Sequence, residues 1–186
     1  MRTASRRMLP VLATAMSVAG IAATSAQAAV VHVTGKSTTV TPSAQAAKFL
    51  SAHSITVSAL GTATLAGGSL TLPISHGHVT TPLHNGVLHH HGGVKFSNGK
   101  RSLVLRSFEL VRATDKTVLT AKFEGVRLII ARVVKLKEVV VGNQVTVTGT
   151  LKLSVAAARG INHLFGHHLV AAGANIGTLS STITLA

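Results

Sequence analysis

Hydrophobic and polar residues alternate along most of the chain, which is the pattern of β-strands that bury one face. Leu103, Leu105 and Ser107, for example, are expected to face one way, and Phe108 the other. Glycine, asparagine and aspartate separate these runs, as in Asn98-Gly99 and Gly142-Asn143, and they suit tight hairpins. The pattern predicts strands near residues 30–41, 55–65, 69–75, 85–97, 101–112, 117–124, 126–135, 138–153 and 174–185.

Two alanine-rich segments break the alternation and predict short helices. They are residues 43–52 and 154–165, and each opens with a serine suited to cap a helix N-terminus. The two segments also resemble each other, because one alignment pairs Ser43 with Ser154 and Lys48 with Arg159. We therefore expect a mainly β fold, an antiparallel β-sandwich or open barrel, with the two short helices in pseudo-repeated strand-helix-strand units.

The first residues have the order of an export signal. Arg2, Arg6 and Arg7 precede an uncharged run of about 16 residues, shorter than the roughly 20 that a spanning helix needs. A small-residue stretch ending at Ala28 follows, which suits cleavage by a signal peptidase. We expect residues 1–28 to be a signal peptide and residues 29–186 to form a single secreted domain without a transmembrane segment. The cell wall is a possible partner of this domain.

Composition narrows the class of protein further. The chain has 18 lysines and arginines against four acidic residues, a net charge of +14, so its field attracts polyanions such as anionic cell-wall polymers. It has no cysteine, which excludes disulfides and thiolate metal sites. The few aromatic residues fall at expected core positions and offer no stacking platform, so nucleic acid is not an expected partner.

Histidine is the ionisable residue present in unusual number. Six of the eleven histidines are His76, His78, His84, His89, His90 and His91. In extended segments His76 and His78 share one side, as do His89 and His91, while His90 points the opposite way. Imidazole is a common ligand of transition metals and of haem iron, so the segment predicts a metal site on His76, His78, His89 and His91. An exposed, solubilising histidine-rich loop is the alternative explanation.

No enzymatic motif is present. The four acidic residues show no paired arrangement for acid-base catalysis, and there is no nucleophile elbow, phosphate-binding glycine loop or zinc-protease motif. We expect a protein that is not an enzyme.

The segment from Gly86 to Phe96, GVLHHHGGVKF, resembles the G-x-[IL]-x-H-x-GG-[LV]-x-F segment of HtaA-type domains. These domains occur in secreted and wall-associated proteins of high-GC Gram-positive bacteria. Shorter flanking pieces agree with the resemblance, which spans roughly residues 33–185: Leu72-Pro73-Ile74, the strand LVLRSFEL at 103–110, Leu119-Thr120-Ala121, and the last helix with Asn162 and Phe165.

The resemblance implies a β-sandwich with short helices that binds haem through a tyrosine assisted by a histidine. His90 matches that histidine, with His89 and His91 as further candidate haem contacts. The chain departs from the family in having no tyrosine, and Phe49 or Leu50 stands in the helical region where the tyrosine is expected. A phenyl ring or an alkyl group cannot ligate iron. Three functions remain open: an envelope domain that binds haem or a metal, a structural or adhesion domain without a small ligand, and a binder of anionic wall polymers.

Overall fold

The structure is a computed structural model and describes residues 29–81, 83–166 and 169–186. The expected signal peptide lies outside the described residues. The helices are α1 (Ala44–Ala52) and α2 (Val155–Phe165). The strands are β1 (Ala29–Pro42), β2 (Thr56–Leu60), β3 (Thr64–Ala66), β4 (Ser69–Thr81), β5 (Gly86–His90), β6 (Gly93–Ser97), β7 (Ser102–Ala113), β8 (Lys116–Phe123), β9 (Val126–Val141), β10 (Gln144–Leu153) and β11 (Asn175–Leu185).

Eight of the described strands form a closed antiparallel ring. Its order is β7-β5-β4-β1-β11-β10-β9-β8, and pairing of β7 with β8 closes it. The other three described strands are short and lie outside this ring. β6 pairs with the first part of β7, β2 pairs with β6, and β3 pairs with β4. The mainly β, antiparallel fold expected from the sequence is confirmed, and its strands form a barrel.

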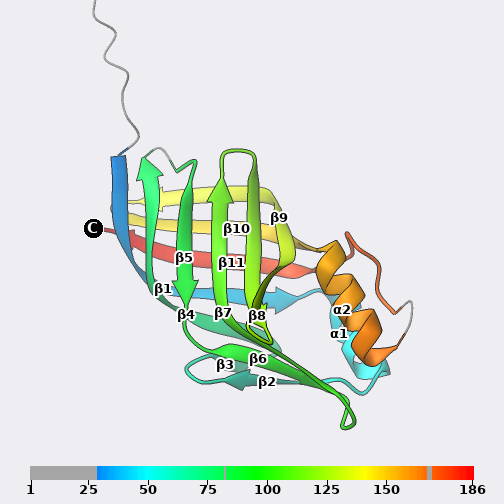
Figure 1. Cartoon of the computed structure of the whole chain (residues 1–186). Helices are drawn as coiled ribbons and strands as arrows, with labels where there is room; N and C mark the ends of the chain where they lie inside the picture. Colours follow the sequence, from blue (N-terminus) through cyan, green and yellow to red (C-terminus); the bar gives the residue numbers. More distant parts are fainter. Residues whose placement is uncertain (1–28, 82, 167–168) are drawn as a thin grey trace, which may run out of the picture.

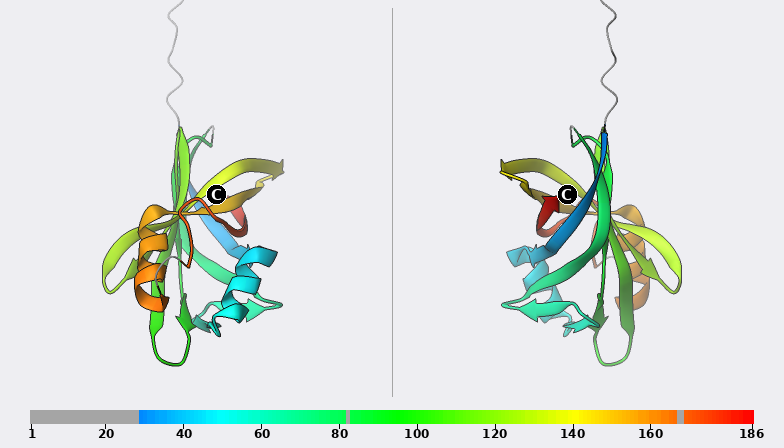
Figure 2. Two further views of the ribbon diagram at one scale, coloured as in Figure 1. Left: turned by 90° about the vertical axis from the view of Figure 1, so that its right-hand side faces the viewer. Right: turned by 90° about the vertical axis from the view of Figure 1, so that its left-hand side faces the viewer.

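The barrel is flattened into two layers. β1, β9, β10 and β11 run across β4, β5, β7 and β8 (Figure 1). Both helices lie at one end of the barrel, on either side of it when the molecule is viewed from that end (Figure 2). The space between the layers is filled by apolar side chains such as Leu72, Val145, Leu151 and Leu179, all essentially inaccessible to solvent. None of the described helices is long and apolar enough to cross a membrane.

The alternation shifts by one residue within β7. Leu103 and Leu105 point into the core as expected, but Ser107 is exposed and Phe108 is buried instead. The expectation for Ser107 and Phe108 was wrong because a β-bulge intervenes: Arg106 pairs with Lys122 and Glu109 with Thr120, and Ser107 has a positive φ of 50°.

Several strand boundaries also differ from the prediction. The segment 55–65 is two strands, β2 and β3, and β4 continues past residue 75 to Thr81. The segment 85–97 is two strands, because the chain turns at His91-Gly92 and Gly92 has a φ of 83°. Conversely, the chain continues as β9 through residues 136–137, with a bulge at Lys135, and the hairpin turn comes at Gly142-Asn143. Alternation alone does not distinguish a bulge from a strand end.

The two helices are attached to the barrel in the same way. Ser43 and Ser154 cap α1 and α2 by accepting hydrogen bonds from Ala46 and Ala157, at 3.1 and 3.0 Å. Each capping residue also bonds a neighbouring strand through its own amide and its hydroxyl. Ser43 donates to Ile176 and Asn175 of β11, and Ser154 donates to Ile130 and Ile129 of β9. This equivalence supports the pseudo-repeat seen in the sequence.

A glycine pair gives a test of this packing. Gly177 of β11 has a φ of 150°, and a Cβ there would collide with the backbone of Thr41 and Pro42. Gly160 of α2 has open space around it. Gly177→Ala should therefore lower the free energy of unfolding by about 1–3 kcal/mol, whereas Gly160→Ala should raise it by up to about 1 kcal/mol. Urea unfolding measures both, and an unaffected Gly177→Ala variant would contradict the close approach of β1 and β11.

Candidate functional site

His90 lies at the end of β5 and points into the barrel, where it is 5% exposed. Its Nε2 is 2.7 Å from the hydroxyl of Thr38 on β1, which in turn is 2.8 Å from the hydroxyl of Ser181 on β11. Both hydroxyl residues are fully buried. This polar cluster therefore connects three strands of the ring inside an otherwise apolar core.

The second nitrogen of His90 bonds the bulge in β7. Its Nδ1 donates to the carbonyl of Phe108 at 3.2 Å. The same bulge exposes the carbonyl of Ser107, which accepts a hydrogen bond from Arg127 at 3.0 Å. The two backbone carbonyls at the bulge therefore accept hydrogen bonds from side chains instead of from a neighbouring strand.

Burial lowers the pKa of His90 from 6.5 to about 4. The bond to the Phe108 carbonyl opposes this shift, and the positive charge that His89 can carry adds to it. The ring is therefore neutral at pH 7, and its Nδ1 carries the proton because a carbonyl can only accept. Nε2 lies 2.7 Å from the buried Thr38 hydroxyl, so both ring nitrogens are engaged inside the core and neither is available to an iron or metal ion.

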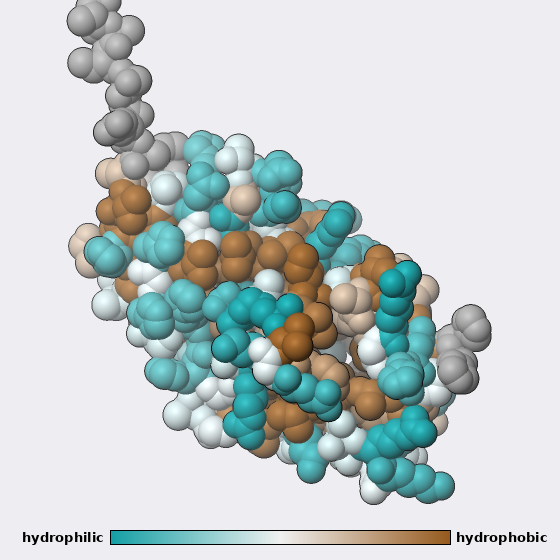
Figure 3. All heavy atoms as spheres, viewed as in Figure 1, coloured by the Kyte–Doolittle hydropathy of each residue, from teal (hydrophilic) through white to brown (hydrophobic). Residues whose placement is uncertain are grey.

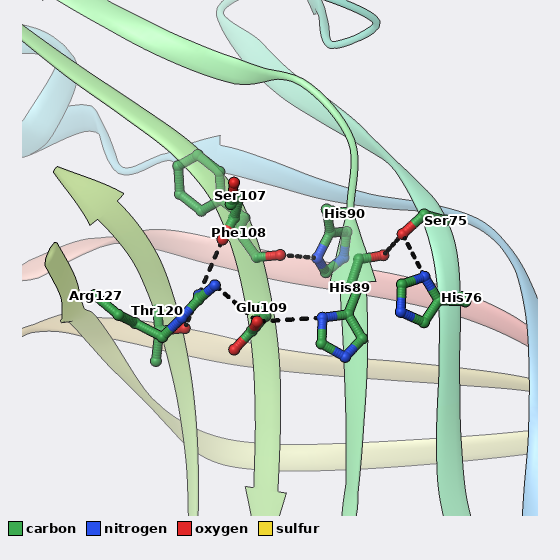
Figure 4. Close-up of polar contacts among 9 residues, drawn as sticks. All are labelled: Ser75, His76, His89, His90, Ser107, Phe108, Glu109, Thr120 and Arg127. Carbon is green, nitrogen blue, oxygen red and sulfur yellow. Dashed lines mark hydrogen bonds and ion pairs between the residues drawn. The ribbon is translucent and has the colours of Figure 1, made fainter. Parts of the chain in front are cut away.

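His89 points to the outside of the barrel, as the alternation with His90 predicts. Its Nδ1 is 3.2 Å from Glu109 on β7, the residue directly opposite in register, and its side chain is 35% exposed. Glu109 is also 2.7 Å from Arg127, which donates to the hydroxyl of Thr120 at 2.9 Å (Figure 4). The carboxylate thus joins a histidine and an arginine on the outer surface.

The ring of His76 stacks on that of His89. The two residues are cross-strand partners on β4 and β5, with ring centroids 4.3 Å apart and planes inclined by 18°. Ser75 forms a bulge in β4, and its hydroxyl lies 3.0 Å from Nδ1 of His76 and donates to the carbonyl of His89 (Figure 4). This pair is the part of the predicted metal set that the structure brings together.

The other two predicted ligands lie apart from this pair. His78 is exposed on the same outer face, two residues along β4, while His91 follows β5 and its amide bonds the carbonyl of Pro73. Within the part of the chain that the structure describes, no three His, Cys, Asp or Glu side chains are placed to surround one metal ion. A site built on all four histidines is not assembled, because the turn at Gly92 separates His91 from the others.

His32 was missed by the sequence reasoning. It is exposed on β1 and directly opposite His78 of β4. No local pattern could have indicated it, because the register between two strands far apart in sequence is set by the whole sheet.

A large apolar cavity opens at the end of the barrel that carries the helices. It has a volume of about 390 Å³ and lies between α1, α2 and the ends of the strands. In Figure 3, hydrophobic residues surround a hollow beside the helices. The helices contribute Phe49 and Leu50 from α1 and Gly160, Ile161 and Leu164 from α2. The position at which the family resemblance places a tyrosine is therefore part of this cavity wall.

Polar contacts around α2 hold the wall in place. Asn162 donates to the carbonyl of Val170 and accepts from its amide, both at 2.9 Å, which fixes the segment after the helix. Arg101, in the turn between β6 and β7, donates to the carbonyls of His163 and Leu164 at the helix C-terminus. The cavity is thus built on supported backbone.

The described part of the cavity wall can contact an apolar surface and offers no side chain that ligates iron. Among the described residues that line it there is no histidine, cysteine, methionine or tyrosine, and the polar side chains are Gln45 and Asn175. A ligand there would be held by contact with aliphatic and aromatic groups.

Comparison with known proteins gives matches to solved structures alone. No family model matches the chain, and no curated protein matches it. The C-terminal domain of HtaA from Corynebacterium glutamicum has a TM-score of 0.65 at 12% identity, over 83% of this chain and 99% of that one.

Two further structures from the same organism agree. Haem-binding protein HtaB has a TM-score of 0.60 at 12% identity, covering 85% of this chain and 96% of that one. The N-terminal domain of HtaA has a TM-score of 0.58 at 11% identity, covering 82% and 99%. At these identities the likeness establishes the fold, and the expected HtaA-type fold is confirmed.

The buried state of His90 predicts a pH dependence of stability. The unfolded chain, with an ordinary histidine pKa of 6.5, binds a proton that the native ring takes up only near pH 4. The stabilisation is therefore complete above pH 6.5 and is lost as the pH falls toward 4, by at most about 3 kcal/mol. Urea unfolding from pH 4 to 8 should show this loss in the wild type and a smaller one in His90→Gln. Equal pH slopes for the two proteins would contradict the assignment.

Proposed function

Because the chain has an HtaA-type fold, we propose that it is a non-catalytic extracellular domain that binds a large apolar ligand in the cavity between α1 and α2. The porphyrin of haem is the proposed ligand. The apolar cavity carries this proposal, because its described walls are almost entirely aliphatic and aromatic and suit a flat hydrophobic ring.

The structural neighbours support the choice of ligand class. HtaB is described as a haem-binding protein, and it shares this fold over most of its length. In this chain the apolar wall formed by Phe49, Leu50 and Ile161 would contact the ring face. Burial of such a surface contributes about 25 cal/mol per Å² before the costs of association.

Iron ligation is not part of this proposal. The described cavity wall offers no ligating atom, the chain has no tyrosine, and both nitrogens of His90 are engaged within the core. Binding should depend on the porphyrin ring rather than on its iron. The extracellular location rests on the export signal expected in residues 1–28.

This function can be tested by comparing haemin with metal-free protoporphyrin IX. We expect the two to bind with dissociation constants within about tenfold of each other, measured by absorbance for haemin and by fluorescence for protoporphyrin. Gly160→Phe should weaken both by about tenfold or more, because the new ring enters the open space beside Gly160.

Ala47→Phe is the matched control, since Ala47 is exposed on α1 and does not line the cavity. It should leave both affinities unchanged, and circular dichroism checks the fold of each variant. Tight binding of haemin without binding of protoporphyrin would show that iron ligation dominates and would overturn the cavity proposal. Binding of neither would also overturn it and favour a structural domain.

A further inference from the structure

Four histidines from three adjacent strands share the outer face of the barrel. His32 of β1 is opposite His78 of β4, and His76 of β4 is opposite His89 of β5. Gly77 separates His76 from His78, so both project to the same side. We call these four residues the histidine band.

The stacked pair within the band has the arrangement expected of metal ligands. Nδ1 of His89 faces Glu109, and Nδ1 of His76 faces the hydroxyl of Ser75. Among the described residues no hydrogen-bond partner of either Nε2 is found. Histidines that bind metals commonly hold one ring nitrogen on a carboxylate, carbonyl or hydroxyl partner and ligate with the other.

We propose that His76 and His89 bind a divalent late transition-metal ion, Zn²⁺ or Cu²⁺, through their Nε2 atoms, with solvent completing the coordination. Neutral imidazole is a good ligand for both ions, and cross-strand partners have Cβ atoms about 5 Å apart, within reach of one ion. The stacked rings must splay for both lone pairs to meet the ion, and the exposure of both side chains permits this rotation.

Glu109 is the positioning residue of this site. It accepts from His89 and is itself held by Arg127, so its orientation is fixed independently of the metal. The arginine offsets the carboxylate charge, which leaves Glu109 as a hydrogen-bond acceptor for the ring rather than as a competing ligand. The site lies on β4, β5 and β7, outside the cavity proposed for the apolar ligand, so it stands independently of that proposal.

Zinc titration of the purified chain without a histidine tag tests the proposal. Isothermal calorimetry in a non-coordinating buffer should give one preferred site, and long-range ¹H–¹⁵N NMR should place the change on Nε2 of His76 and His89. His76→Ala and His89→Ala should each weaken this binding by about tenfold or more, and Glu109→Gln should weaken it to a smaller extent.

The double variant His84→Ala, His91→Ala is the matched control. It removes two exposed histidines of the same sequence segment that lie outside the histidine band, and it should bind zinc like the wild type. All these residues are at least partly exposed, so the variants should fold, which thermal unfolding without metal verifies. Unchanged affinity in His76→Ala and His89→Ala, or an equal loss in the control, would overturn the proposal and reduce the pair to a stacking contact.

Discussion

Strand β7 leaves the regular ladder at Ser107 and Phe108, and the core, the buried histidine and the outer histidines all meet at this bulge. It turns Phe108 into the core and exposes two carbonyls, one for His90 inside the barrel and one for Arg127 outside. Arg127 in turn holds Glu109, which orients His89. A single extra residue thus couples the interior polar cluster to the surface pair, while β7 still closes the ring with β8.

Much of this fold follows from local patterns. The capping serines and alanine-rich runs locate both helices, and alternation places His90 and His89 on opposite faces of their strand. Local patterns do not reveal where alternation slips, because a bulge at Ser107 or Lys135 and a strand end look alike in sequence. Nor do they give the register that brings His32 opposite His78, which depends on the pairing of β1 with β4. The apolar cavity is also beyond the sequence, since its walls come from most of the chain.

The departure from the family pattern is concentrated in one region. Where the resemblance implies a tyrosine, Phe49 and Leu50 complete an apolar wall, while the histidine that matches the family, His90, is satisfied by Thr38 and Phe108. The apolar wall and the hydrogen-bonded state of His90 are chemically consistent with each other, because neither leaves a group free to ligate iron. In this chain His90 is held in the core by its hydrogen bonds, where it serves the packing of the barrel.

The pairing of β1 with both β4 and β11 has a consequence for how the molecule forms. Val33 pairs with Leu185, and Pro42 with Gly177, so the first strand of the ring needs the last one as its neighbour. Such long-range contacts make folding slow, because much loop-closure entropy is lost before they are gained. The ring cannot be completed until residues 175–185 have been synthesised. The topology itself therefore keeps the barrel open, with β1 lacking one of its two neighbours, until the last strand of the ring has been made.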